Sequence, residues 1–289
     1  MKVYIITSAK HEEIYLKEWI DYNISLGIDK IIINDNNEID YPYKLKDVIK
    51  EYVDKGIVII DRYYDTHKLE SIIAEKELNK VYTYLYNKYK NEFDYCLKID
   101  IDEFVYCPET NNDIKKFIQQ DKFKQYDEIL LNWINYRSKT EYLDQYVPLP
   151  IQMRFKELHE PKYKLCCKSI IKSLAEFIEL NHHVANIDND KKCLANGLNL
   201  NDALSKDIVE QQNRKINLKY EYNEEFKQYA YIKHYRYRNE EETLFRLEKL
   251  ENHLDPNKPY ALEKYNKLKH IKKRDLYQIY LNRENKDIC

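Results

Sequence analysis

Short apolar segments alternate with amphipathic segments through the first 133 residues, and this alternation constrains the fold of the chain more than any other feature. Two predicted helices end before Gly27 and Gly56, because glycine favours the left-handed backbone that ends many helices. Short apolar strands separated by helices predict an α/β fold, with a mostly parallel sheet flanked by helices. The predicted strands are residues 2–7, 30–35, 57–61, 95–101 and 127–133, and the predicted helices are residues 12–26, 44–54 and 69–90.

Acidic residues lie at the ends of three successive predicted strands. Asp35 ends the second strand, Asp61 ends the third, and Asp100 and Asp102 lie at the end of the fourth. Ligands of parallel α/β sheets bind at the carboxyl ends of the strands, so these residues predict a binding site at one edge of the sheet. Aspartate is also a common turn residue, and Asp61 fits that alternative equally well.

The segment YCLKIDIDEFVY, residues 95–106, places two carboxylates two residues apart. Strand alternation predicts that Lys98, Asp100 and Asp102 share one face, opposite an apolar face. Two carboxylates so close repel each other unless a positive charge lies between them. A divalent cation with oxygen ligands, completed by a diphosphate, meets this need. The alternative is that both aspartates are solvated or cap the next helix.

Only three glycines are present, and this excludes several nucleotide-binding motifs. A Walker P-loop, a dinucleotide fingerprint and a Gly-x-Ser-x-Gly nucleophile elbow all need glycines at fixed spacings that this chain lacks. A bound phosphate must therefore be held by a metal, by side chains or by ordinary backbone.

The net charge and the cysteine content restrict the expected binding partners and the expected cellular compartment of the protein. The formal net charge of -2 gives no electrostatic argument for nucleic acid binding. None of the six cysteines forms a Cys-x-x-Cys pair, so we expect no structural zinc site and reduced thiols. We see no signal peptide and no apolar run of the ~20 residues that span a membrane, which favours a cytoplasmic location.

The second half of the chain is less regular. It predicts a smaller mixed region with strands at residues 166–173, 177–187 and 229–235, a polar and mobile loop over 188–219, and helix from residue 239 onward. The basic run 264–274 predicts either contact with the inner face of an anionic membrane or a solvated helix face. The predicted domains are residues 1–238, divided into halves 1–133 and 134–238, and a helical extension over 239–289.

Three motifs together carry a resemblance to a known family. They are KHEEIYLKEWIDYNISLGIDKIIINDNNEID near the N-terminus, KIDIDEF at the paired aspartates, and YIKHYRYRNEEETLFR late in the chain. With them the chain resembles family-2-like glycosyltransferases, and it is closest to the family 92, or DUF23, branch. The resemblance covers residues 1 to about 250 and is weakest over 134–165.

The chain departs from the family pattern in four places. His11 replaces the usual Asn, and Glu38 and Ile39 stand where Ser-Thr is common. Trp133 lacks the Phe-Gly that usually lies near it, and Arg238-Asn239 stand in for Lys-Ser. The last two departures bear on the identity of the acceptor more than on the binding of the donor.

The resemblance implies a GT-A fold with a nucleotide-sugar-binding half and a variable acceptor half. It also implies a divalent metal, Mn²⁺ or Mg²⁺, between the Asp-x-Asp motif and the donor diphosphate. In this scheme Asp102 coordinates the metal, and Asp100 contacts the ribose, a metal-bound water or the metal. The further donor-site residues that the resemblance implies are Lys10, Glu12, Asp35 and Asn36, around the uracil and ribose.

The resemblance also points to histidines, while the general base is left open. His234 lies in the late motif and is expected to be a metal ligand or its neighbour, next to Lys233 and Arg236. His183, or else His182, is expected to be a further metal ligand, and only one of the two is expected to enter the site, because adjacent strand residues face opposite ways. For each of these histidines the alternative is an ordinary core or surface residue. An inverting transferase needs a carboxylate base, for which Glu141 and Asp144 are candidates, with surface charges as the alternative.

These features predict a metal-dependent, inverting glycosyltransferase. The expected donor is a nucleoside diphosphate sugar such as a UDP-sugar, and the expected acceptor is a glycan or glycolipid of a bacterial surface polysaccharide. Two alternatives remain: a metal-dependent nucleotidyltransferase, which would need a second basic cluster for a triphosphate, and a non-catalytic sugar-binding module.

Overall fold

The structure is a computed structural model of the chain, and it divides into two compact units. Unit 1 contains Met1–Ile134 and Glu160–His234, and unit 2 contains Asn135–His159 and Tyr235–Cys289. The residues described are 1–63, 77–138, 155–157, 164–177, 179–181, 183–204, 216–217, 226–238, 240–249, 259–270, 275 and 278.

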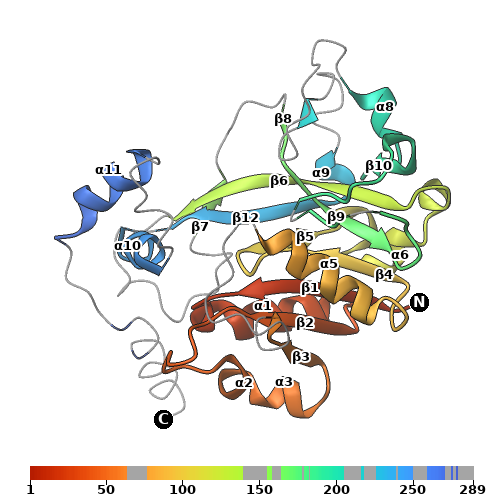
Figure 1. Cartoon of the computed structure of the whole chain (residues 1–289). Coiled ribbons are helices and arrows are strands. Elements are labelled where there is room, and N and C mark those ends of the chain that lie inside the picture. Colours follow the sequence, from red (N-terminus) through yellow and green to blue (C-terminus); the bar gives the residue numbers. More distant parts are fainter. Residues whose placement is uncertain are drawn as a thin grey trace. The chain divides into compact units, whose positions relative to one another are not determined.

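The N-terminal half of unit 1 is a parallel sheet with strand order β3-β2-β1-β4 (Figure 1). This arrangement confirms the predicted α/β class, and the sheet buries apolar residues of every strand. The strands are β1 (Val3–Ala9), β2 (Lys30–Asp35), β3 (Val58–Asp61) and β4 (Tyr95–Lys98). The helices are α1 (Glu13–Ser25), α2 (Leu45–Val48), α3 (Lys50–Asp54) and α5 (Leu78–Tyr89).

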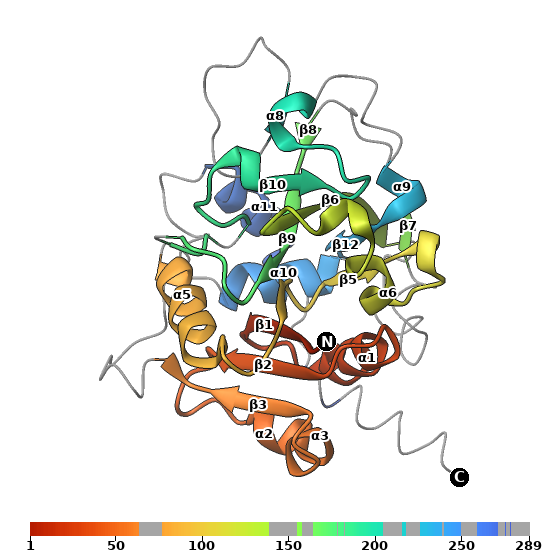
Figure 2. The same ribbon diagram turned by 90° about the vertical axis from the view of Figure 1, so that its right-hand side faces the viewer.

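Helices α5 and α1 lie on opposite sides of these strands (Figure 2). The apolar face of α5 packs on β1, β2 and β4 through a cluster that includes Tyr82, Leu85 and Tyr86. On the other side, Trp19 of α1 donates its indole N–H to the carbonyl of Glu103 at 2.9 Å. Helix α1 is thus bonded to the first residue of β5, and α5 packs on the strands from the other side.

The second half of unit 1 extends the same sheet in the order β4-β9-β6-β12-β5, and it is the mixed region that the sequence predicts. Strand β9 pairs antiparallel with both β4 and β6, and β12 pairs antiparallel with β5. The strands of the path are β5 (Glu103–Tyr106), β6 (Glu128–Ser138), β9 (Cys167–Lys172) and β12 (Tyr231–Tyr237). The shorter elements of unit 1 are η2 (Pro108–Thr110), α6 (Ile114–Ile118), η3 (Asp121–Phe123), β8 (Lys164–Leu165), η5 (Asn189–Lys191), β10 (Lys192–Leu194), α8 (Leu200–Ala203), β11 (Ile216–Asn217) and α9 (Phe226–Tyr229). The short strand β7 (Phe155–Glu157) belongs to unit 2.

Three local predictions are wrong in detail. The strand predicted over 95–101 ends at Lys98, and residues 101–102 form a turn before β5. The segment 177–187 forms only an isolated bridge between Leu180 and Ala185 in its described residues. The polar stretch from residue 188 is an ordered part of unit 1 up to residue 204, because β10 pairs with β6 and Leu200 packs in a small core.

The described part of unit 2 ends in two helices, as predicted, α10 (Glu240–Lys249) and α11 (Pro259–Leu268). They pack against each other through buried Leu244, Leu247 and Leu268. Among the helices described, none is both long enough and apolar enough to cross a membrane. The domain boundaries proposed from the sequence stay a prediction.

Candidate active site

The paired aspartates lie in the tight connection between β4 and β5. The backbone N–H of Glu103 donates to the Asp100 carbonyl at 3.0 Å, and the Glu103 carboxylate accepts the Asp100 backbone N–H at 2.9 Å. This closed turn replaces the strand alternation that the sequence predicts. The two aspartates consequently differ in exposure: 42% of the Asp100 side chain is exposed, against 3% for Asp102.

A buried lysine neutralises the exposed aspartate. The ammonium of Lys168 on β9 donates to Oδ2 of Asp100 at 2.8 Å and lies 3.7 Å from Oε2 of Glu103. Burial raises the pKa of the Asp100 carboxyl, but the charge and hydrogen bond of Lys168 hold that pKa below its usual value. Burial raises the pKa of Glu103 well above its usual value, which favours its protonated form.

A histidine from the late motif lies next to the buried aspartate. On β12, His234 pairs with Glu103 of β5, which places it beside Asp102. Its Nε2 lies 3.7 Å from Oδ1 of Asp102, and both side chains are buried. The sequence prediction that His234 belongs to the site agrees with this geometry, while its role as a metal ligand stays a prediction.

Trp133 contacts both histidines of the site. Its ring centroid lies 5.1 Å from that of His183 and 4.4 Å from that of His234. His183 is buried, and its Nδ1 lies 3.2 Å from the carbonyl of Cys167, next to Lys168 on β9. Of the adjacent pair, His183 is thus the one described at the site, since His182 lies outside the described residues.

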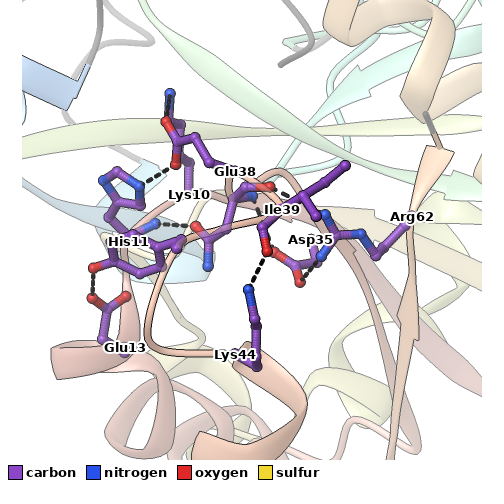
Figure 3. A network of polar contacts seen from close by, with 10 residues as sticks. Lys10, His11, Glu13, Asp35, Glu38, Ile39, Lys44 and Arg62 are labelled. Carbon is purple, nitrogen blue, oxygen red and sulfur yellow. Dashed lines mark hydrogen bonds and ion pairs between the residues drawn. The ribbon is translucent and has the colours of Figure 1, made fainter. Parts of the chain in front are cut away.

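A second polar network joins the loops after β1 and β2 (Figure 3). The Asp35 carboxylate accepts a hydrogen bond from Arg62 at 2.9 Å and another from the backbone N–H of Asn37 at 3.1 Å. The Asn37 side chain in turn accepts the backbone N–H of His11 at 2.7 Å. Asp35 therefore ties the loop that follows β2 to Arg62, directly after β3, and the Asn37 side chain joins the same loop to the loop that follows β1. The predicted contact of Asp35 with uracil or ribose stays a prediction.

Glu38 contacts two basic side chains in this network. It lies 3.0 Å from the Lys10 ammonium and 2.5 Å from Nε2 of His11. Burial raises the pKa of Glu38, but hydrogen bonds, including those from Lys10 and His11, lower it below the usual value. The His11 ring stacks on Tyr41, with centroids 4.0 Å apart. His11 has a φ of 53°, a strained backbone for a residue other than glycine.

The remaining predicted residues fall into three groups: those beside the second network, one in a structural contact, and two outside the described residues. Asn36 is buried and its backbone N–H donates to the Ala9 carbonyl at 2.8 Å, while Glu12 precedes α1 at its N-terminus. Asp61 instead accepts hydrogen bonds from Lys88 at 2.7 Å and from Tyr89 at 3.1 Å, so it joins a structural contact with α5. Glu141 and Asp144 lie outside the described residues.

The sequence of the whole chain was compared with known protein families. The profile of glycosyltransferase family 92 matches residues 9–282. This chain belongs to glycosyltransferase family 92. It is therefore a glycosyltransferase, which confirms the family and the enzyme class that the three motifs predict.

No curated protein matches this family 92 glycosyltransferase. Among solved structures it is similar to S. aureus TarS, with 15% identity and a TM-score of 0.34 over 47% of this chain and 22% of that chain. A second S. aureus TarS structure, of residues 1–349, has 13% identity and a TM-score of 0.37, over 60% of this chain and 47% of that chain. Mannosyl-3-phosphoglycerate synthase from Rubrobacter xylanophilus has 10% identity and a TM-score of 0.31, over 49% of this chain and 42% of that chain. The match thus spans less than half of each of these chains, and likenesses this low carry no argument about activity.

The side chains of the family 92 site fit a metal only in part. The described residues contain no group of three or more His, Cys, Asp or Glu side chains that would hold an ion. Two ligands about 2.1 Å from one ion can lie up to about 4.2 Å apart, so the 3.7 Å between Asp102 and His234 fits a shared ion. Such an ion would need its remaining ligands from the substrate and water.

Three residues of the two networks escaped the sequence analysis: Lys168, Glu38 and Arg62. Lys168 had a signal, because a lysine in the apolar strand CCKSII must be paired if it is buried. Glu38 was noted only as a departure from the family pattern. Arg62 lies directly after a strand end, and nothing in its neighbours marks it as the partner of Asp35.

Proposed function

We propose that this glycosyltransferase moves a sugar from a UDP-sugar to a glycan or glycolipid acceptor in bacterial surface polysaccharide synthesis, with a divalent ion and inversion at the anomeric carbon. The observation that carries the proposal is the 3.7 Å separation of Asp102 and His234, next to a half-exposed Asp100. Two side chains at ligand spacing beside an accessible carboxylate suit a diphosphate and its ribose.

In this proposal each network has one task. Asp102 and His234 hold Mn²⁺ or Mg²⁺, which when bound neutralises the charge that develops on the leaving diphosphate. Asp100 accepts hydrogen bonds from the ribose. The loops that contain Lys10, Glu12, Asp35 and Asn36 surround the base, and Trp133 offers an aromatic face to a sugar ring.

The general base is the open part of the proposal. Inversion requires a carboxylate that removes the proton of the acceptor hydroxyl. Glu141 and Asp144 stay the candidates for that base. Family membership favours this glycosyltransferase proposal over a nucleotidyltransferase or a non-catalytic sugar-binding module.

A nucleotide-sugar screen tests the proposal. Purified protein is incubated with UDP-, GDP- and CMP-sugars, with manganese or with chelator, and the released nucleotide is measured. We expect release from a UDP-sugar only with the metal, and calorimetry should show UDP binding that weakens about tenfold or more in chelator. Equal UDP affinity with manganese and with chelator would contradict the metal-bridged site.

We also propose peripheral contact with the inner face of the membrane through the basic run 264–274. Its described part lies in and just after α11 and includes Lys264, Lys267 and Lys269. Lys267 is paired with Glu263 at 2.6 Å, which reduces its availability to anionic lipids. Sedimentation with vesicles of anionic and of neutral lipids distinguishes membrane contact from a solvated helix face.

A further inference from the structure

The fully buried ammonium of Lys168, on β9, lies against the turn that contains the paired aspartates. The side chain of Lys168 is 0% exposed, and β9 holds its backbone between β4 and β6. Burying an ammonium is strongly unfavourable unless it is paired and hydrogen-bonded. Asp100 supplies this partner at 2.8 Å, and Oε2 of Glu103 lies 3.7 Å from the ammonium, so the lysine and the turn constrain each other.

Asp100 is held on one side and accessible on the other. Its Oδ2 accepts from Lys168, its Oδ1 lies 3.4 Å from the hydroxyl of Tyr82, and its backbone N–H donates to Glu103. Despite these contacts, 42% of its side chain is exposed. A carboxylate with this arrangement is ionised, fixed in direction and able to accept further hydrogen bonds from a ligand.

The two aspartates of the motif therefore face different partners. Asp100 has the ammonium of Lys168, while Asp102 faces His234. We propose that Lys168 is a positioning residue of the donor site: it holds Asp100 as a hydrogen-bond acceptor for the donor and keeps it out of the ligand set of the metal. This inference rests on the proposed function, because the donor and the metal belong to it.

The inference predicts opposite effects on two ligands, which a purely structural lysine would not produce. In Lys168→Met, Asp100 is no longer fixed, so UDP in saturating manganese should bind about tenfold more weakly. The same variant leaves a second carboxylate beside Asp102, so manganese alone should bind about threefold or more tightly. Calorimetry measures the first constant, and electron paramagnetic resonance of free manganese measures the second.

Lys192 provides a matched control. Its side chain is 8% exposed, lies 3.7 Å from Glu128 and donates to the Ala185 carbonyl at 3.0 Å. Lys192→Met therefore also removes a buried, paired ammonium from unit 1, but not at the paired aspartates. We expect it to lower the melting temperature and to leave both binding constants within about twofold of the wild type.

A second comparison does not depend on the folding of Lys168→Met. It compares Asp100→Asn with the double variant Asp100→Asn/Lys168→Met. The double variant removes the ammonium together with its carboxylate partner, so no unpaired charge is buried, and this favours its folding. If Lys168 acts through Asp100, both variants bind UDP equally weakly, within about twofold. A further tenfold loss in the double variant overturns the inference, since Lys168 would then act on the donor directly.

The outcomes also separate this inference from the proposed function. Wild-type protein that binds neither manganese nor UDP overturns the proposed function, and the inference falls with it. Wild-type protein that binds both, with Lys168→Met weakening UDP and manganese together or changing neither, overturns the positioning role alone. Opposite shifts in Lys168→Met, absent in Lys192→Met, support it.

Discussion

Oδ1 of Asp102 lies 3.7 Å from Nε2 of His234, although one residue belongs to the turn after β4 and the other to the late strand β12. The antiparallel pairing of His234 with Glu103 brings the two together. The middle and the late motif thus meet at one point of the sheet, and the first two predictions below concern that point.

Asp102→Asn should lower turnover by about 100-fold or more, because the amide loses the charge that would hold the metal. The fold should remain, since Asp102 lies in a turn and the amide has nearly the same shape. Asp100→Asn is the matched control and should lower turnover by only about tenfold. Nucleotide release and thermal melting check both variants, and wild-type turnover in both would place the site elsewhere.

His234→Ala should raise the manganese concentration needed for half-maximal activity by about tenfold or more, because one ligand is lost. The melting temperature without metal should change little. A manganese titration of nucleotide release gives the midpoint for variant and wild type. If the variant melts much earlier and its residual activity keeps the wild-type metal dependence, His234 is a core histidine, and a ligand must be sought at His183 or His182.

Asp61 and Asp35 both end strands, but their contacts predict that replacing each by Asn has a different effect. Asp61→Asn should lower the free energy of unfolding by about 1–3 kcal/mol, because Asp61 is buried and accepts from Lys88 and Tyr89. Its UDP affinity should equal that of the wild type. Asp35→Asn should weaken UDP binding about fivefold or more, because the amide loses the ion pair with Arg62 that holds the loop after β2. Denaturant unfolding and calorimetry measure the two effects, and a UDP defect in Asp61→Asn contradicts the assignment.

Lys98→Met should stabilise the protein at neutral pH by roughly 1–4 kcal/mol. Lys98 is fully buried, and within the residues described here its ammonium has no hydrogen-bond partner. Burial, followed by the charge of Lys168, lowers the pKa of Lys98 well below its usual value. The unfolded chain then binds a proton that the folded protein does not, which destabilises the wild type wherever the pH lies between the two pKa values.

The stability gain of Lys98→Met must therefore depend on pH in a fixed direction. Wild-type stability rises with pH toward the ordinary lysine pKa, by at most about 1.4 kcal/mol per pH unit, and the variant lacks this term. The difference between variant and wild type should shrink from pH 6 to pH 9 in urea unfolding. The Lys98 ammonium lies 5.1 Å from the ring centroid of Tyr82 and near the charge of Glu128. A variant less stable than wild type at pH 7 would mean that these two groups stabilise the charged lysine.

The sequence by itself determined the parallel half of the fold and the positions of its strand ends. Strands β1 to β3 and helix α1 follow local patterns of apolar residues, and Gly27 and Gly56 both have the positive φ that ends a helix. These patterns act over a few residues, so they can be recognised without any knowledge of distant contacts. The motif at Asp100 and Asp102 and the family resemblance could also be recognised from short stretches of sequence.

Only the tertiary structure decided which of these residues act together. The closed turn, and not strand alternation, separates exposed Asp100 from buried Asp102. The antiparallel register of β9 brings Lys168 within hydrogen-bond distance of Asp100. The position of α5 places Lys88 where its ammonium donates to Asp61. Such pairings depend on strand order and on the burial of charge between segments far apart in the chain. A local pattern contains no information about either, because many distant residues of the same type would satisfy it equally well.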